Sequence, residues 1–217
     1  MRRLTGVIAV LGLVLGATGQ AGAVAVPIVN SGFELPLQTD GMFTLTPNTA
    51  VGWLHDAGAG VWNPSAAQAY SGNAPEGQNV AYSNGASLSQ TLLTLFAANT
   101  TYTLTAQVGH RGDAAFPGYR VQLLEDAVVL AECVTCVTPS ANSFSLSTVT
   151  FTSGPSVPTA LLGIRLVSSD TQTDFDDIKL DASPAPVPEP GTLFLIGAGL
   201  AGLGVIGRRS WFKGADD

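Results

Sequence analysis

Residues 101–108 read TYTLTAQV, and this stretch decides the fold class. Its apolar side chains, Tyr102, Leu104, Ala106 and Val108, alternate without a break with threonine and glutamine side chains. Successive side chains of a strand point to opposite sides, so strict alternation separates an apolar face from a polar one. The stretch therefore predicts a β-strand with one face suited to a core.

The rest of the interior has the same texture. Runs rich in β-forming residues, bounded by Gly, Pro, Asn or Asp, occupy residues 86–92, 119–124, 127–131, 143–152, 159–167 and 173–180. None of these runs repeats its apolar residues with a helical period. Many short strands with turn residues between them predict an all-β protein, an antiparallel β-sandwich or barrel, and not βαβ units.

Charge limits the partners of this domain. The 217-residue chain has a net charge of −7, and its interior, residues 26–186, contains four basic and thirteen acidic side chains. Nucleic-acid binding depends on clustered Lys and Arg, which this interior lacks. We therefore expect no nucleic-acid partner, whereas a divalent cation or a neutral partner fits the charge.

The first 25 residues have the parts of a secretory signal peptide. Arg2 and Arg3 form a basic start, residues 4–15 are apolar but too short to span a bilayer, and small residues around 21–25 offer a cleavage site. Glycines at four positions make a poor buried helix of this segment. The sequence predicts export, with the mature protein beginning near residue 26.

The carboxyl end begins with a proline-rich linker. Residues 183–191 read SPAPVPEPG, and residues 192–206 are apolar or small, followed by Arg208 and Arg209. A bilayer-spanning helix needs about 20 residues, which the segment approaches when the flanking arginines are counted. The chain thus divides into a signal peptide (1–25), a β-sandwich ectodomain (26–182), a linker (183–191) and a hydrophobic helix with a basic tail (192–217).

This carboxyl end resembles the PEP-CTERM sorting signal of exopolysaccharide-producing Gram-negative bacteria. The resemblance rests on Pro188, Glu189 and Pro190, the apolar stretch after them, and Arg208-Arg209. It implies a single transmembrane helix that anchors the protein in the inner membrane. It also implies recognition by the membrane protease exosortase, then transfer to the cell surface or extracellular matrix, where exopolysaccharide is a possible partner.

Weaker motifs resemble galactose-binding-like jelly rolls, a fold common among carbohydrate-binding modules. They occur in the order expected for that fold: VNSGFE (29–34), GW (52–53), GQNVAY (77–82), LSQTL (88–92) and FDDIKL (175–180). The resemblance implies an antiparallel jelly-roll sandwich, and it implies a structural Ca²⁺ between an early acid and the late Asp pair.

The acids that match this pattern are Glu34, Asp176 and Asp177. Asp176 shares strand parity with Ile178 and Leu180, so we expect it to point inward with Glu34 as its partner; a register slip of one residue would substitute Asp177. Carboxylate and carbonyl oxygens are the ligands that Ca²⁺ prefers. The alternative is that Glu34 caps a turn and the two aspartates begin a surface strand.

The cysteines form a C-x-x-C pair, Cys133 and Cys136. Zinc would need a second pair, and no strand-then-helix pattern places the thiols at a helix start. In an oxidising compartment such neighbours form a local disulfide, which we expect here. The loop that it closes is short, so its stabilising effect should be modest.

Glycan binding is the first functional hypothesis, because carbohydrate modules stack aromatic rings on sugars. Trp62, in GAGVWNPS, and Phe116, in AAFPGY, have loop-like neighbours and are the candidates for exposed rings. We expect Trp53, Tyr82 and Tyr119 in the core. The sequence therefore predicts a non-enzymatic matrix or glycan-interacting protein, with a structural coat protein without a ligand as an alternative.

A surface hydrolase acting on exopolysaccharide is the competing class. His55 and His110 are the histidines of the chain, and aspartate follows His55 directly, but no G-x-S-x-G accompanies them. We expect His55 to be an exposed loop residue, and Arg111-Gly112-Asp113 to be a polar turn. A histidine bonded to a serine, or carboxylates converging on a cleft, would favour the enzyme.

Overall fold

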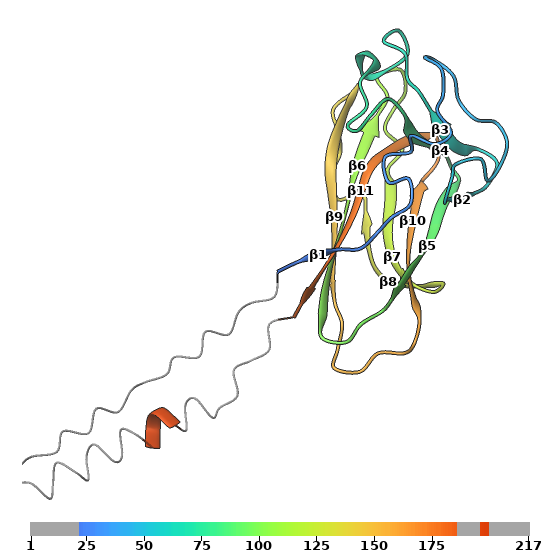
Figure 1. Ribbon diagram of the computed structural model, residues 1–217. Coiled ribbons are helices and arrows are strands. Elements are labelled where there is room, and N and C mark those ends of the chain that lie inside the picture. Colours follow the sequence, from blue (N-terminus) through green and yellow to red (C-terminus); the bar gives the residue numbers. More distant parts are fainter. Residues whose placement is uncertain (1–21, 186–195, 200–217) are drawn as a thin grey trace, which may run out of the picture.

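The computed structural model describes residues 22–185 and 196–199, and the strands among them form two antiparallel sheets. Residues 1–21, most of the hydrophobic carboxyl end and the PEP motif lie outside the described residues, so the signal peptide and the membrane helix stay predictions. Among the residues described, no helix has the length and apolarity that a bilayer crossing requires. The antiparallel β-sandwich predicted from the sequence is confirmed (Figure 1).

The six-stranded sheet has the order β3-β4-β11-β6-β9, with β1 pairing on β11. Its strands are β1 (Val24–Ala25), β3 (Ala59–Trp62), β4 (Val80–Asn84), β6 (Thr100–His110), β9 (Ser143–Thr152) and β11 (Gln172–Pro184). The second sheet has the order β2-β5-β10-β7-β8. Its strands are β2 (Leu54–His55), β5 (Ser87–Leu95), β7 (Tyr119–Glu125), β8 (Val128–Val134) and β10 (Leu161–Ser168). A 3-10 turn, η1, spans Tyr70–Gly72.

The main core lies between the two sheets and follows from the alternation read in the sequence. Tyr102, Leu104, Ala106 and Val108 are all buried in it, as the pattern of β6 predicted. The rings expected in the interior, Trp53, Tyr82 and Tyr119, are also buried, although Tyr82 lies in a different cluster. That separation shows that the six-stranded sheet buries side chains on both of its faces.

A second, smaller cluster covers the outer face of the six-stranded sheet. Its buried members are Trp62, Ala69, Tyr70, Val80 and Tyr82. Residues 63–79, which include η1, form the loop that supplies Ala69 and Tyr70 to this cluster, and they lie at the end of the sandwich opposite to β1 (Figure 1). We call this group the outer cluster; it is where polar and aromatic side chains of several strands come together.

A bulge in β11 decides which of its acids reach the outer face. Pairing with β6 shifts between Asp176 and Lys179, and Asp177 has a left-handed backbone with φ of 47°. The extra residue reverses the alternation, as β-bulges do. Phe175 and Ile178 therefore both point into the main core, whereas Asp176 lies opposite Gln107 on the outer side. The expectation that Asp176 points inward with Ile178 is wrong for this reason.

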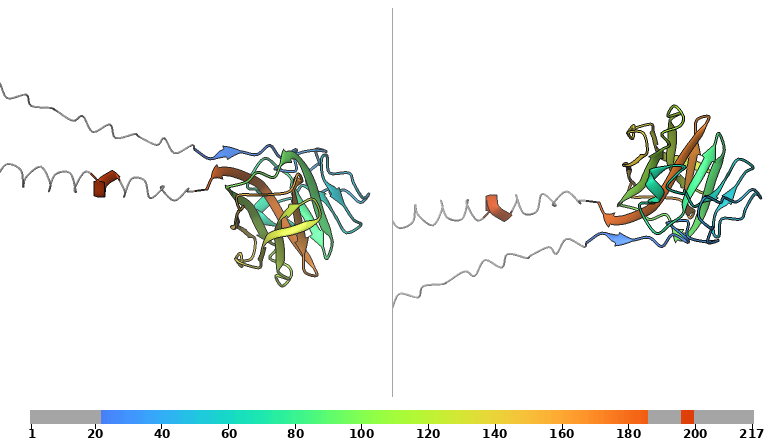
Figure 2. Two further views of the ribbon diagram at one scale, coloured as in Figure 1. Left: turned by 90° about the horizontal axis from the view of Figure 1, so that it is seen from below. Right: turned by 90° about the horizontal axis from the view of Figure 1, so that it is seen from above.

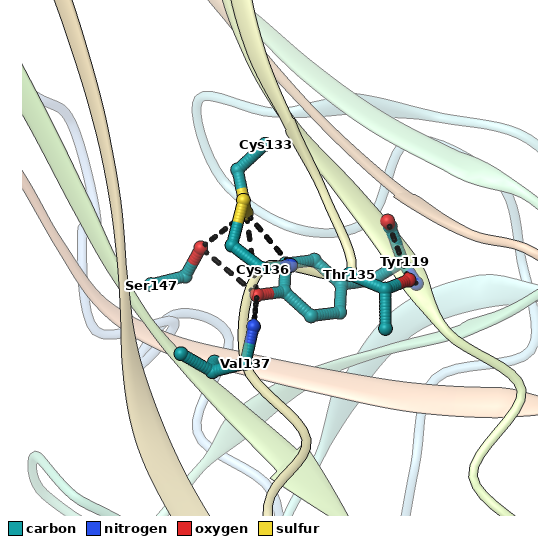
Figure 3. Close-up of a disulfide and its surroundings, with 6 residues drawn as sticks. All are labelled: Tyr119, Cys133, Thr135, Cys136, Val137 and Ser147. Carbon is teal, nitrogen blue, oxygen red and sulfur yellow. Dashed lines mark hydrogen bonds between the residues drawn. A yellow bond between two sulfur atoms is a disulfide. The ribbon is translucent and has the colours of Figure 1, made fainter.

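The cysteines stabilise the end of edge strand β8. The structure joins Cys133 and Cys136 by a disulfide, and Cys133 is buried. The Ser147 hydroxyl donates to Cys133 Sγ at 3.1 Å, and the Tyr119 hydroxyl accepts from the Val137 N–H at 3.2 Å (Figure 3). Cys133 thus belongs to a buried polar cluster with Tyr119 and Ser147, whereas Cys136 is exposed.

The first and last strands of the domain lie next to each other. Val24 pairs with Ala182 and Ala25 with Asp181, so β1 lies along the last part of β11. In both views of Figure 2, β1 and the end of β11 run side by side at one side of the molecule. β11 therefore connects the outer cluster at its start to the exit of the chain at its end.

Candidate functional site

One row of residues crosses the outer face of the six-stranded sheet. Register pairs Gly60 with Tyr82, Tyr82 with Asp174, Asp174 with Gly109, and Gly109 with Phe144. The row places a carboxyl group at the centre of the sheet, between an aromatic ring and a glycine on its two neighbouring strands. This row is the floor of the candidate site.

Glycine at position 109 makes room for the aromatic side chains above the floor. A Cβ built there would lie 2.6 Å from the Phe144 ring and 2.8 Å from the Tyr70 hydroxyl, closer than real Cβ atoms come. A glycine inside a strand commonly marks such a close approach. The absent side chain lets the Tyr70 and Phe144 rings pack at 4.4 Å between centroids above Gly109, the strand neighbour of Asp174.

Tyr70 comes from the loop and not from the sheet. It lies in η1 with φ of 56°, a left-handed conformation that is uncommon outside glycine, and it is buried. Its hydroxyl donates to Asp174 Oδ2 at 2.5 Å. Burial raises the pKa of the Tyr70 phenol, and the Asp174 charge raises it further, so Tyr70 remains a proton-bearing donor.

Asp174 has no exposed surface, and two side chains hold its carboxyl group. Besides Tyr70 at Oδ2, Gln172 Nε2 donates to Oδ1 at 2.7 Å. Burial raises the pKa of Asp174 to about 6, because the ionised form loses solvation, while the hydrogen bonds from Tyr70 and Gln172 and the charge of Arg111 oppose that rise. A carboxyl group with a pKa near 6 carries a proton in roughly one molecule in ten at pH 7, far more often than a carboxyl group of ordinary pKa.

A pocket of about 330 Å³ opens beside this acid. Its lining is partly aromatic, from Phe43, Trp62 and Tyr82, and partly polar, from Gln68, Asn84, Arg111 and Gln172. Gln172 separates the pocket from Asp174, since it lines the pocket and donates to the carboxylate. The carboxyl group therefore lies one layer below the pocket floor.

Arg111 covers the aromatic wall. Its guanidinium carbon lies 5.1 Å from the centre of the Trp62 ring, within the range of a cation–π contact. One of its nitrogens donates to Gln172 Oε1 at 2.6 Å, and two others donate to Asp113. Arg111 and Asp113, which we expected to form only a polar turn, thus connect the solvent to the buried acid through Gln172.

The predicted calcium ligands lie near one turn but already have protein partners. Glu34 Oε1 accepts from the N–H groups of Gln78 and Asn79, while Asp176 accepts from the N–H groups of Glu76 and Asp177. Burial raises the pKa of Asp176 to about 8, although both of those hydrogen bonds lower it.

The remaining candidate, Asp177, pairs with Lys179 at 2.7 Å. Among residues 22–185 and 196–199, no group of three or more His, Cys, Asp or Glu side chains is placed to hold a metal. The calcium site therefore stays a prediction from the sequence.

The two rings predicted to stack on a glycan, Trp62 and Phe116, are not fully exposed in the structure. Trp62 lies on β3, not in a loop, and only 4% of it is exposed, so the expectation of an exposed Trp62 is wrong. Alternation on β3 points its ring to the outer face, where it packs against Tyr70. Phe116 is half-buried and packs against His110 and Tyr119.

The histidines do not form a nucleophilic site. His55 is buried, contrary to expectation, and its Nε2 accepts the N–H groups of Thr49 at 3.0 Å and Ala50 at 3.3 Å. His110 bonds the carbonyl oxygens of Pro139 and Ala114. Within the part of the chain described, neither ring bonds a serine.

Sequence reasoning missed Asp174 and Gln172, and it considered Tyr70 only as one of several candidate aromatic rings for contact with a sugar. Two glycines inside strands, Gly60 and Gly109, carry the sequence signal for this site, because a glycine there often marks a close approach. A Cβ at Gly60 would lie 2.2 Å from the Thr44 hydroxyl. The residues packed over these glycines could not be found without the fold.

A jelly-roll sandwich with an acid buried beneath an aromatic pocket defines the class of protein. The chain belongs to the HpiC1-like cyclase family, since the family model described as HpiC1 cyclase matches residues 24–181. A second family model, the PEP-CTERM protein-sorting motif, matches residues 186–210 and confirms the sorting signal predicted from Pro188, Glu189 and Pro190. That motif marks an exported protein sorted to the cell surface.

Solved cyclases have the same fold. A Stig cyclase from Fischerella sp. TAU, in complex with (3Z)-3-(1-methyl-2-pyrrolidinylidene)-3H-indole, is 34% identical with a TM-score of 0.70. A cyclase structure from the same organism with 4-(1H-indol-3-yl)butan-2-one is 35% identical with a TM-score of 0.68. Each alignment covers 76% of this chain and 100% of the other. No curated protein sequence matches the chain.

Carbohydrate-binding modules are also among the structural neighbours, as the jelly-roll resemblance implied. A xylan-binding domain from Paenibacillus barcinonensis is 12% identical, covering 69% of this chain and 99% of its own, with a TM-score of 0.46. Likeness at that level says nothing about glycan binding here.

The expectation of a non-enzymatic protein is corrected by these matches. The family and its solved members are cyclases, at identities of 33–35% over three quarters of the chain. The physical reason for the error is that Asp174 lies on β11, a strand that the sequence suggested only as part of the sandwich. Its partners come from distant parts of the chain.

Proposed function

We propose that this protein is an exported cyclase that closes a ring in an aromatic substrate bearing an alkene, with Asp174 as the proton donor. The observation that carries the proposal is the carboxyl group of Asp174, buried beside an aromatic pocket and held by Tyr70 and Gln172. The family assignment supports ring closure as the reaction.

The chemistry needs no co-reactant. Protonation of one alkene carbon by the Asp174 carboxyl group uses the π electrons of the C=C bond for the new C–H bond and leaves a carbocation on the neighbouring carbon. A second π bond of the substrate then attacks that carbon, and the new C–C bond closes the ring. Loss of a proton to the Asp174 carboxylate restores the acid, so substrate and product are isomers.

The aromatic wall suits such an intermediate. A cation near the face of Trp or Tyr is attracted by the ring quadrupole, and desolvation strengthens that attraction. Trp62 and Tyr82 supply ring surface to the pocket. The indole ligands of the Fischerella cyclases support an indole-type aromatic group as the part of the substrate that fills this pocket.

Access to the acid requires a local movement. Asp174 has no exposed atom, and Gln172 lies between it and the pocket. A substrate therefore reaches the carboxyl group after Gln172 turns away, or receives its proton through the Tyr70 hydroxyl.

Deuterium incorporation tests the proposal. Purified protein is incubated in D₂O with a set of 3-alkenylindoles, and mass spectrometry follows isomeric products. We expect cyclised products with one added deuterium, and Asp174→Asn should lower their formation by about 100-fold or more, the usual contribution of general acid catalysis. Products without deuterium, or full activity in the Asp174→Asn variant, would refute the assignment of the acid.

Sorting at the carboxyl end is proposed to follow the motif. Exosortase would recognise Pro188, Glu189 and Pro190, with the hydrophobic segment and Arg208-Arg209 holding the protein in the inner membrane until it is cut. Replacing residues 188–190 by alanine should leave uncut protein in the membrane fraction. Unchanged processing of that variant would argue against the reading of the motif.

A further inference from the structure

We infer that the substrate of this pocket carries a negatively charged group, such as a carboxylate, and that Arg111 is the residue that selects it. This inference rests on the proposed function and narrows its substrate class. It starts from the presence of a guanidinium in a pocket whose other walls are aromatic rings and amides.

Arg111 is an unusual residue for this domain. Only four basic side chains occur in residues 26–186, and Arg111 is the one that lines the pocket. A pocket meant for an uncharged hydrocarbon gains nothing from a guanidinium that it must partly desolvate, because burying a charge costs free energy unless it is paired. The side chain of Arg111 is 27% exposed, and its charged partner Asp113 is 55% exposed and offsets this cost only in part.

The donors of Arg111 are not all used. A guanidinium has five N–H donors in a planar fork that matches a carboxylate. Three hydrogen bonds are formed, two to Asp113 and one to Gln172. Two N–H groups therefore remain for an acceptor at the pocket.

Asp113 is a weak competitor for that place. Its side chain is 55% exposed, and exposed ion pairs contribute little because water screens them. A ligand carboxylate lying against the aromatic wall would be less solvated and would bind the fork more strongly. When Asp174 is protonated, as its role as an acid requires, the charged side chains at the pocket, among the residues described, are Arg111 and Asp113. Their opposite charges cancel.

The same anion would help to uncover the acid. Arg111 holds Gln172 at 2.6 Å, and Gln172 covers Asp174. A carboxylate that binds the two free N–H groups and draws the guanidinium away from Gln172 Oε1 releases the Gln172 amide. The charge preference and access to Asp174 would therefore depend on the same hydrogen bond, which makes Arg111 a specificity and positioning residue.

Three ligands with one skeleton test the preference. The neutral probe is 4-(1H-indol-3-yl)butan-2-one, the anionic probe 3-(1H-indol-3-yl)propanoate replaces its methyl group by an oxygen, and the cationic probe is 4-(1H-indol-3-yl)butan-2-amine. Calorimetric titration of the exported protein should show the anion binding about tenfold more tightly than the ketone, the contribution of one charge-assisted hydrogen bond. The amine should bind more weakly than the ketone.

Variants assign the preference to Arg111. Arg111→Met should remove the tenfold ratio, Arg111→Lys should keep part of it, and Asp113→Asn should increase it by removing the competing carboxylate. Arg120→Met is the matched control, because Arg120 lies in the second sheet and pairs with Glu132 at 3.6 Å. It removes the same charge and should leave all three affinities unchanged.

The outcomes separate the two proposals. Equal binding of ketone and anion by the wild-type protein overturns the charge preference and leaves the cyclase proposal standing. No binding of any probe overturns both, since the pocket would then not hold an indole. A ratio that survives Arg111→Met in folded protein assigns the preference elsewhere and overturns the role of Arg111.

Discussion

The Tyr70 hydroxyl donates to the Asp174 carboxylate at 2.5 Å, although 104 residues separate them in the sequence. The bond joins the loop over the outer face to the central strand beneath it. It holds the proposed acid in place and keeps the loop on the sheet. Most of the predictions below depend on this contact or on residues packed around it.

The pH dependence of cyclisation should follow Asp174. Its pKa is raised to about 6 by burial, and the groups around it are Tyr70, Gln172, Arg111 and, beyond Arg111, Asp113. Only the protonated carboxyl group donates, so kcat/KM should be constant at low pH and fall about tenfold per pH unit above about 6. A rate that rises through this range would show that the carboxylate acts as a base.

Asp174 should also affect stability with the opposite sign to a salt-bridged acid. Its pKa in the folded protein lies above its ordinary value of 3.8, so the free energy of unfolding falls as pH rises from about 4 to 6. Above about pH 6 the whole of this loss applies. Asp174→Asn should therefore be more stable than the wild type at pH 8, by a few kcal/mol at most. Thermal unfolding at pH 4 and pH 8 measures this difference.

Removing the Tyr70 hydroxyl should move the pH profile. The hydrogen bond from Tyr70 lowers the pKa of Asp174, so Tyr70→Phe should shift the falling limb of the rate to higher pH. A role of Tyr70 in packing alone would lower the amount of folded enzyme without moving the limb. Profiles of the two proteins, each normalised to its folded fraction, distinguish these cases.

Gly109→Ala should lower both the stability of the protein and its activity, because it adds a methyl group to the floor of the site. The new methyl group would meet the Phe144 ring and the Tyr70 hydroxyl at distances that require both to move. Overpacking of this kind costs about 1–3 kcal/mol, and the displaced Tyr70 should also lower activity. Gly154→Ala is the control, since nothing lies within 4 Å of a Cβ there. Equal melting temperatures for the two variants would contradict the close packing.

His55 should prove structural. His55→Ala leaves the N–H groups of Thr49 and Ala50 without their acceptor, and an unsatisfied buried donor costs about 1–3 kcal/mol. Cyclisation per folded molecule should not change, because the ring touches neither the pocket nor Asp174. Loss of an esterase or glycosidase activity in this variant would instead revive the hydrolase hypothesis.

Calcium removal tests the remaining sequence prediction. If Glu34 and Asp176 hold Ca²⁺, the ion should raise the melting temperature in a concentration-dependent way, as any ligand of the folded state does. EDTA should reverse the rise, and Glu34→Gln should abolish it. An unchanged melting temperature would leave these carboxylates with their backbone N–H partners alone.

The sandwich could be predicted from the sequence because alternation is a local property. The strand expected at 143–152 has those bounds, and that expected at 119–124 is one residue longer. The site could not be predicted in the same way. The bulge at Asp177 reverses the parity on which the position of Asp176 was argued. Trp62 was taken for a loop residue because its strand has only four residues.

Long-range contacts account for the rest. Arg111 and Gln172 are 61 residues apart, and Asp174 has partners on a loop that carries no strand pattern. No periodicity reveals such neighbours. The family match places the chain among cyclases, and the site that we propose consists of these contacts and not of exposed rings.

Strand β11 has a consequence for how the protein faces its surroundings. It begins at Gln172 in the pocket wall and ends at Pro184, just before the sorting motif at residue 186, a run of thirteen residues or roughly 40 Å of extended chain. A surface that holds the motif would therefore hold the domain by the pole opposite to its pocket. Substrate would enter and product would leave on the side turned toward the medium.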